Sequence, residues 1–208
     1  MQIRSAGHGG VLVDFGDDAT PAEVDAWRAE LWRRREAGEF QATDIVPGAR
    51  TVLIDGVDDA DRLADRLPGW APPIGAASES GVLMEIPIRY DGPDLAVVAR
   101  HWSVSEESVI ARHGATEFRV AFCGFAPGFG YMTGLPTELA VPRLDTPRTR
   151  VPPGSVGLAD IYCGVYPTAS PGGWLLIGTT DAILFDPDRD PPALLSPGTR
   201  VRFVPESQ

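Results

Sequence analysis

The sequence predicts an α+β protein, in which a small N-terminal α/β domain of ββαββα order precedes a β-barrel. Two strand–strand–helix units fill residues 1–68, a proline- and glycine-rich stretch follows them, and the last half of the chain consists mainly of short strands between turns. We therefore expect one domain over residues 1–75 and a second over residues 81–208.

In the first domain, alternating apolar residues predict four strands, at residues 2–4, 11–15, 43–47 and 50–55. A helix is expected to begin after Thr20, with Glu23 as its capping-box partner, and to end at Gly38. The run Arg33–Arg35 then falls in its last turn, where cations favour the helix dipole; an anion site is the alternative. A second helix is predicted at residues 58–67.

Residues 68–80 have the composition of a linker, and the second domain begins after them. Helices are expected at residues 94–102 and, behind a capping box of Ser103 and Glu106, around Val109 and His113. Strands are expected at residues 81–90, 117–123, 156–158, 164–166, 174–178, 183–185 and 200–204.

Composition excludes several functions. The net charge is −11, which argues against a nucleic-acid partner. All 18 basic residues are arginine, so the chain supplies neither a Walker-type phosphate loop nor a catalytic lysine. No His, Cys and carboxylate cluster has metal-ligand spacing, and no apolar run is long enough for a membrane span. We expect a cytoplasmic protein whose two cysteines are reduced.

The stretch from Gly124 to Gly178 is dense in glycine, proline and aromatic residues, which is typical of shaped binding loops or, alternatively, of an irregular β-domain with tight turns. Within it, Arg148 and Arg150 alternate around Thr149, so an extended backbone would project both guanidinium groups to one side. Such a pair suits a carboxylate or phosphate-like anion, and surface salt bridges are the alternative.

Three further side chains are candidates for chemistry. His113 could act as an acid or base, although a histidine at a helix C-terminus is also a favourable dipole partner. His8 lies in a glycine-rich turn. Cys123 could be a nucleophile with His113, but its apolar strand favours an inert thiol.

The second domain contains a series of ordered motifs: Gly124-Phe-Ala-Pro-Gly-Phe-Gly-Tyr131, Ala140-Val-Pro-Arg143, Thr146-Pro-Arg-Thr-Arg-Val-Pro152, Gly164-Val-Tyr-Pro167 and Ser170-Pro-Gly-Gly-Trp174. These motifs resemble those of the allophanate hydrolase subunit 1 family, which includes the sporulation kinase inhibitor KipI and the B subunit of prokaryotic 5-oxoprolinase.

The resemblance implies a cyclophilin-like β-barrel for the second domain and a subunit 2 (KipA-like) partner. It also implies a 5-oxoprolinase that uses ATP, together with an A subunit, to convert 5-oxo-L-proline to L-glutamate; ATP is not expected to bind this chain alone. Two alternatives stay open: a carboxyltransferase half that acts on urea or a related amide with biotin, and a KipI-like inhibitor of a histidine kinase.

Applied to the matching motifs, the resemblance implies a site for a small amide substrate. Its catalytic residues would be Arg148 and Arg150, which would stabilise developing negative charge. We add His113 to the catalytic residues from its own position in the sequence, as a candidate acid or base. Its substrate-binding residues would be Pro127, Gly128, Phe129, Tyr131, Arg143, Tyr166, Ser170 and Gly172. The sequence departs from the family pattern in one place: Asp160-Ile161-Tyr162-Cys163 stands where the family commonly has a Gly-Gly-Gln-Thr-like run. If this loop touches the substrate, the substrate implied by the resemblance need not apply to this chain.

Overall fold

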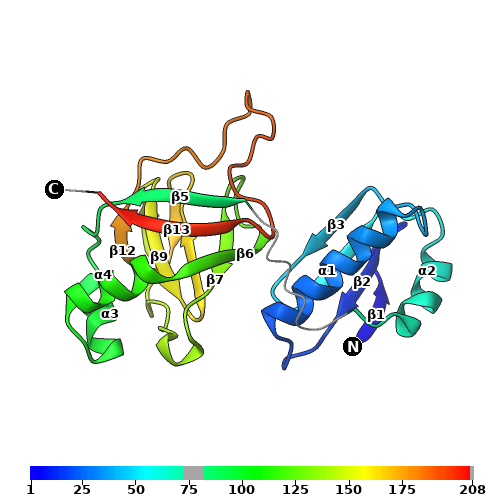
Figure 1. Ribbon diagram of the computed structural model, residues 1–208, viewed down its shortest axis with the longest axis horizontal. Coiled ribbons are helices and arrows are strands. Elements are labelled where there is room, and N and C mark those ends of the chain that lie inside the picture. The colour runs from blue at the N-terminus through cyan, green and yellow to red at the C-terminus, as the bar shows by residue number, and fades with distance from the viewer. Residues whose placement is uncertain (73–81, 207–208) are drawn as a thin grey trace. The chain divides into compact units, whose positions relative to one another are not determined.

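The computed structural model describes residues 1–72 and 82–206. The chain divides into two compact units, Met1–Ser80 and Gly81–Gln208, whose ribbons are drawn in Figure 1. The predicted α+β class, with a small α/β unit ahead of a β-barrel, is confirmed by the element order.

The first unit is a four-stranded antiparallel sheet covered by two helices (Figure 1). The strand order is β1-β2-β4-β3, with the bounds β1 Gln2–Ser5, β2 Val11–Asp14, β3 Asp44–Pro47 and β4 Thr51–Asp55. Val11 pairs with Ile54 and Val13 with Val52, and all four are buried. The helices α1 (Pro21–Glu36) and α2 (Ala60–Arg66) add their apolar faces to the same core.

Helix α1 begins and ends as its sequence predicts. The backbone N–H of Glu23 donates to the Thr20 hydroxyl at 3.2 Å. In the last turn, Arg33 and Arg34 both pair with Glu30, and the hydrogen bond from Arg33 lowers the pKa of Glu30 to about 2. The arginine run is therefore part of the helix surface, as its position in the last turn indicates.

The first residues of the predicted linker belong to the first unit. Residues Leu67–Gly69 form a 3₁₀ helix, η1, and Trp70 packs on Phe40 with ring centroids 5.9 Å apart. The guanidinium group of Arg34 lies 4.2 Å from the Trp70 ring centroid, a cation–π contact. The prediction of a linker was wrong for residues 68–70, because the Trp70 side chain is stabilised by packing on Phe40 and Arg34 and would lose these contacts in an exposed spacer. Residues 73–80 lie outside the described part of the chain.

The second unit is a seven-stranded, nearly closed barrel of strand order β12-β9-β10-β7-β6-β13-β5. A pair of backbone hydrogen bonds between Arg89 and Thr179, 2.9 and 2.8 Å long, joins the ends of the two edge strands. Only β13 and β5 run parallel within this sheet. The bounds are β5 Leu83–Ile88, β6 Glu117–Cys123, β7 Gly130–Thr133, β9 Ser155–Ala159, β10 Tyr162–Val165, β12 Leu175–Thr179 and β13 Arg200–Pro205.

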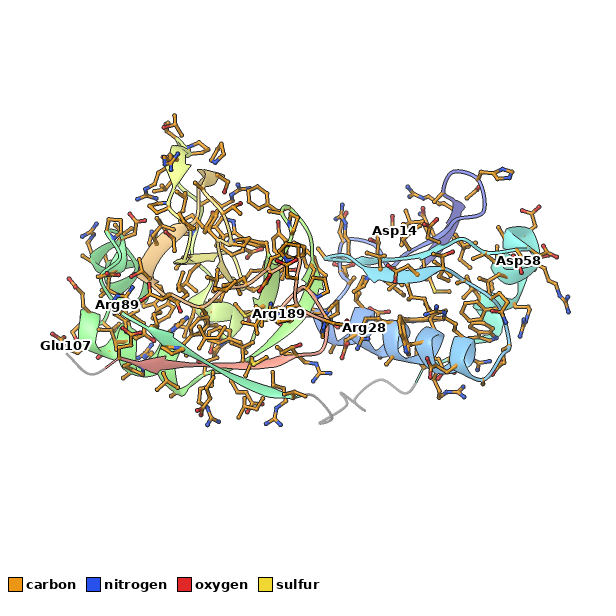
Figure 2. All side chains as sticks on the ribbon, turned by 90° about the horizontal axis from the view of Figure 1, so that it is seen from above. Asp14, Arg28, Asp58, Arg89, Glu107 and Arg189 are labelled. Atoms are coloured by element: carbon orange, nitrogen blue, oxygen red, sulfur yellow. The ribbon has the colours of Figure 1, made fainter. Side chains whose placement is uncertain are left out.

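A three-residue ion-pair cluster reinforces the closure. Arg89, labelled in Figure 2, follows β5 and donates to Asp181 beyond β12 (2.9 Å) and to Glu206 beyond β13 (2.8 Å). The cluster is exposed, so its contribution to stability is modest, yet it ties three separate segments of chain at one point of the barrel.

Helices α3 (Leu95–Trp102) and α4 (Glu106–Ala115) pack against the barrel and complete its core. The capping box predicted at Ser103 was wrong: Ser103 adopts a left-handed conformation (φ 53°) that ends α3, and the Ser105 hydroxyl caps α4 by accepting from Ser108 N–H at 3.3 Å. Among the described residues, no helix has the length and apolar character needed to cross a membrane.

Three strands were missed and one was wrongly predicted. The glycine-rich motif runs into strand β7, and β8 (Arg148–Val151) pairs with β11 (Ser170–Gly172) in a separate two-stranded ribbon. Residues 183–185 form no strand and contribute only a bridge between Phe185 and Ala193. Short apolar runs do not distinguish strands from packed loops, since both bury alternate side chains.

Candidate functional site

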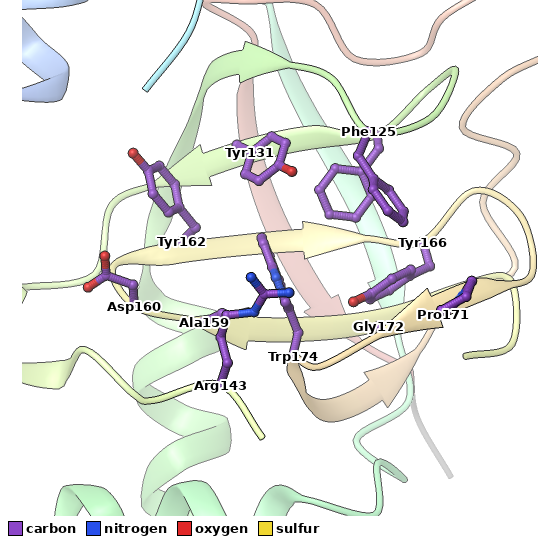
Figure 3. Close-up of a pocket in the computed structure, with 11 residues that line it drawn as sticks. Phe125, Tyr131, Arg143, Ala159, Asp160, Tyr162, Tyr166, Pro171, Gly172 and Trp174 are labelled. Carbon is purple, nitrogen blue, oxygen red and sulfur yellow. The ribbon is translucent and has the colours of Figure 1, made fainter. Parts of the chain in front are cut away.

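A cavity of about 200 Å³ opens in the second unit, and aromatic rings form most of its wall (Figure 3). Its rings come from the loop after β6, from β7, from β10 and from the segments that flank β11. The lining residues are Phe125, Phe129, Tyr131, Arg143, Ala159, Asp160, Tyr162, Tyr166, Pro171, Gly172 and Trp174.

The aromatic wall is held by edge-to-face contacts. The ring of Phe129 lies 5.4 Å from that of Trp174 at 82° and 5.4 Å from that of Tyr166 at 75°. Tyr131 contacts Trp174 in the same way, at 5.6 Å and 67°. These rings belong to a small apolar cluster separate from the barrel core. Because each ring touches several others, the wall is preformed rather than assembled around a ligand.

Two glycines make room for this wall. A Cβ on Gly164 would lie 2.8 Å from Phe129 and 2.9 Å from Trp174. A Cβ on Gly172 would lie 2.4 Å from the Tyr166 hydroxyl. The rings therefore rest directly on backbone, which only glycine permits at these two positions.

We expect Gly172→Ala to destabilise the protein by about 1–3 kcal/mol, because the new methyl group collides with Tyr166 inside a packed cluster. Urea unfolding measures the loss. Tyr166→Phe removes the closest of the clashing atoms, so the double variant should recover part of it. A Gly172→Ala protein as stable as the wild type would contradict this account of the glycine.

Arg143 is the cation of the cavity. Its backbone is fixed from both sides, since Val141 and Asp160 exchange two hydrogen bonds (3.2 and 2.7 Å) and Leu144 N–H donates to Gly173 at 2.7 Å. Figure 3 shows the guanidinium group directed into the cavity, whereas the carboxylate of Asp160 turns away from it. Within residues 1–72 and 82–206, no carboxylate forms an ion pair with Arg143.

The tyrosines of the cavity are hydrogen-bond donors at neutral pH. Burial raises the pKa values of Tyr131, Tyr162 and Tyr166 above the usual value for a phenol. The hydroxyl groups of Tyr131 and Tyr166 point toward the middle of the cavity, as does Arg143 (Figure 3). The cavity therefore combines flat apolar walls, a guanidinium group and neutral donors, an arrangement suited to a small planar anion.

The structure brings together five of the eight residues predicted to bind substrate: Phe129, Tyr131, Arg143, Tyr166 and Gly172 all line the cavity. Pro127, Gly128 and Ser170 do not. Gly128 instead shapes the loop with φ at 85°, where a Cβ would meet Phe185 at 2.8 Å. Their role in binding stays a prediction.

Sequence reasoning missed several lining residues, among them Phe125, Asp160, Tyr162 and Trp174. Phe125 and Trp174 stood within recognised motifs, and Asp160 and Tyr162 belong to the segment that departs from the family pattern. The departure from the family pattern was the signal in the sequence that could have pointed to these two lining residues.

The two arginines predicted to face one anion are used differently. The guanidinium group of Arg148 donates to both carboxylate oxygens of buried Asp94, at 2.7 and 2.8 Å, and to the Trp174 carbonyl at 3.3 Å. Asp94 also accepts from Leu176 N–H at 2.7 Å. Arg150 is exposed, and neither arginine lines the cavity. Asp94, distant in sequence, thus binds Arg148, and a joint role of Arg148 and Arg150 at one anion stays a prediction.

His113 and Cys123 also lie outside the cavity lining. His113 is fully buried, with Nδ1 2.8 Å from the Tyr90 hydroxyl and Nε2 3.5 Å from Cys163 Sγ. Burial lowers the pKa of His113 to about 3, so the ring is neutral at pH 7. The Cys123 thiol donates to Leu195 O at 3.7 Å, and burial raises its pKa. The cysteine next to His113 is thus Cys163 rather than the one considered from sequence.

The remaining candidate side chain and a possible metal site were also considered. His8 is exposed, belongs to the first unit and does not line the cavity. Over the described residues, no group of three or more His, Cys, Asp or Glu side chains is placed to hold a metal ion.

Residues 1–195, which include the cavity-lining residues, match the family model described as carboxyltransferase domain, subdomain C and D, so the chain belongs to the class of carboxyltransferase-like domains. The B subunit of 5-oxoprolinase from Escherichia coli O157:H7 is 42% identical, with a match over 93% of this chain and 95% of that protein. The B subunit from Haemophilus influenzae is 38% identical, over 89% and 90%. The chain belongs to the family of 5-oxoprolinase B subunits.

A solved structure supports the fold. The crystal structure of TTHA0988 superposes with a TM-score of 0.76 at 34% identity, and the match covers all of this chain but 41% of that one. This chain therefore spans less than half the length of that relative, whereas it matches the two B subunits almost from end to end.

Proposed function

We propose that this chain is the B subunit of an ATP-dependent 5-oxoprolinase that converts 5-oxo-L-proline to L-glutamate. The observation that carries the proposal is the length of the match to the Escherichia coli protein, 93% of one chain and 95% of the other. Its partners would be a subunit 2 (KipA-like) protein, which is the C subunit of such an enzyme, and the A subunit. A cytoplasmic location stays a prediction.

The chain is expected to be inactive alone and to leave ATP to one of its partners. It has no lysine for a phosphate loop. Its cavity of about 200 Å³ is smaller than the roughly 300–1,000 Å³ of pockets for drug-sized ligands. A small amide fits this space better than a nucleotide does.

The geometry revises the residue roles within this proposal. Arg143, which lines the cavity, replaces Arg148 and Arg150 as the cation that meets the substrate. Arg148 becomes a positioning residue, because it bonds to the carbonyl of Trp174 in the cavity wall. His113 is assigned to the core, since the ring is buried and neutral.

The test is reconstitution. The chain is co-expressed with the homologues of the C and A subunits from its own organism, and ATP hydrolysis and glutamate formation are measured with 5-oxo-L-proline. We expect activity from the complete set and none when this chain is omitted. A complete, folded complex that forms no glutamate would disprove the proposal.

One half of a carboxyltransferase is the second candidate, favoured by the description of the matching family model. It would require a biotinylated carrier and would act on urea or a related amide. Dependence of activity on that carrier, rather than on 5-oxoproline, would select it. Inhibition of a histidine kinase stays a prediction, and a pull-down against the kinases of the host tests it.

A further inference from the structure

The cation of the cavity determines the charge of its ligand. Arg143 has no ion-pair partner in the described chain, although the protein carries a net charge of −11 and ample carboxylates. Arg143 is exposed and lines the aromatic cavity, and the backbone on either side of it is hydrogen-bonded at Val141 and Leu144. A guanidinium group in this place can bind a planar carboxylate with two parallel hydrogen bonds.

The walls determine the shape of the ligand. Phe129, Tyr131, Tyr166 and Trp174 meet edge to face around the space and give it flat apolar walls. Aromatic cavities also bind organic cations, but a guanidinium group inside this one would repel them. A flat ring a few atoms across that carries a negative group fits both the cavity volume of about 200 Å³ and its charge.

The hydroxyl groups supply the remaining polar contacts. Tyr131 and Tyr166 direct O–H groups into the space between the walls and Arg143 (Figure 3). A neutral phenol donates a hydrogen bond to a carbonyl oxygen, and it can accept one from an amide N–H. A ring amide offers both groups on one edge.

We propose that this cavity binds a small cyclic amide carboxylate, with Arg143 bound to the carboxylate and with Tyr131 and Tyr166 hydrogen-bonded to the ring amide. The inference rests on the proposed function only in naming 5-oxo-L-proline as that ligand. The cavity of this chain then selects the substrate of the complex, and Arg143 makes a carboxylate on that substrate necessary for tight binding.

The experiment uses the reconstituted complex and compares two variants. Arg143→Ala removes the cation of the cavity, and Arg112→Ala, on the exposed surface of α4, is the matched control. We expect Arg143→Ala to raise KM for 5-oxo-L-proline about 10- to 100-fold, the effect of losing charge-assisted hydrogen bonds. Arg112→Ala should change KM less than about twofold.

Ligand analogues separate the two parts of the site. Isothermal titration with 5-oxo-L-proline, 2-pyrrolidinone, which lacks the carboxylate, and cyclopentanecarboxylate, which lacks the amide, is carried out on wild-type and variant complexes. The wild type should discriminate strongly against 2-pyrrolidinone, and Arg143→Ala should abolish that discrimination. Tyr131→Phe and Tyr166→Phe should weaken the binding of 5-oxo-L-proline without weakening that of cyclopentanecarboxylate.

The outcomes separate this inference from the proposed function. An active complex in which Arg143→Ala retains the wild-type KM and the wild-type discrimination would overturn the inference and leave the function standing. A complete complex that makes no glutamate, yet binds 5-oxo-L-proline in an Arg143-dependent way, would overturn the function and support the site. Circular dichroism of each variant shows that a lost affinity is not a lost fold.

Discussion

Arg148→Ala is expected to destabilise the second unit by about 3 kcal/mol. The substitution removes both hydrogen bonds to the carboxylate of Asp94, whose side chain is 8% exposed. A buried charge left without its partner costs about 3–5 kcal/mol, and the lower end applies because Arg148 itself is partly exposed. The same change frees the Trp174 carbonyl, so the cavity wall should lose order together with the barrel.

Urea unfolding of the full chain measures this effect, and hydrogen exchange in peptides from β8 and β12 shows where it occurs. Arg150→Ala is the matched control for stability, because it lies two residues away on the same strand and is exposed; it should change the free energy of unfolding by less than about 0.5 kcal/mol. Equal stability of the two variants would contradict the role given to the Asp94–Arg148 pair.

The free energy of unfolding should fall by about 2 kcal/mol between pH 7 and pH 5 because of His113. Burial lowers the pKa of this histidine to about 3 in the folded protein, whereas an unfolded histidine has a pKa near 6.5. Below pH 6.5 the unfolded state therefore binds one more proton than the folded state, and stability declines by about 1.4 kcal/mol per pH unit. The loss ends near pH 3, where the folded state also becomes protonated.

The matched variant is His113→Gln, which stays neutral and can still form a hydrogen bond with the Tyr90 hydroxyl. Its stability should be nearly independent of pH between 7 and 5. Ion-paired carboxylates such as Glu30, whose pKa is lowered to about 2, affect stability only at more acidic pH. A wild type and a variant with the same slope over this range would show that His113 is not the cause.

Local sequence was sufficient for most of the elements. Helix α1 was predicted from Thr20 to Gly38, because its cap and its apolar spacing are both local signals. The alternation of Phe118 and Val120 identified β6 for the same reason. Strand β7 was missed, because a glycine-rich motif has the local composition of a loop. It becomes a strand only through backbone hydrogen bonds to neighbouring strands such as β6, which local sequence does not reveal.

The sequence by itself determined that the site is rich in aromatic residues and glycine and that the chain has no lysine. Any cation that the stretch from Gly124 to Gly178 supplies to the site must therefore be Arg143, Arg148 or Arg150. Only the tertiary structure decided which arginine faces the cavity. Asp94, 54 positions before Arg148, reaches it across the fold and binds it, whereas Arg143 is left lining the cavity. Charge pairing depends on distances between segments remote in sequence, and spacing along one strand carries no information about them.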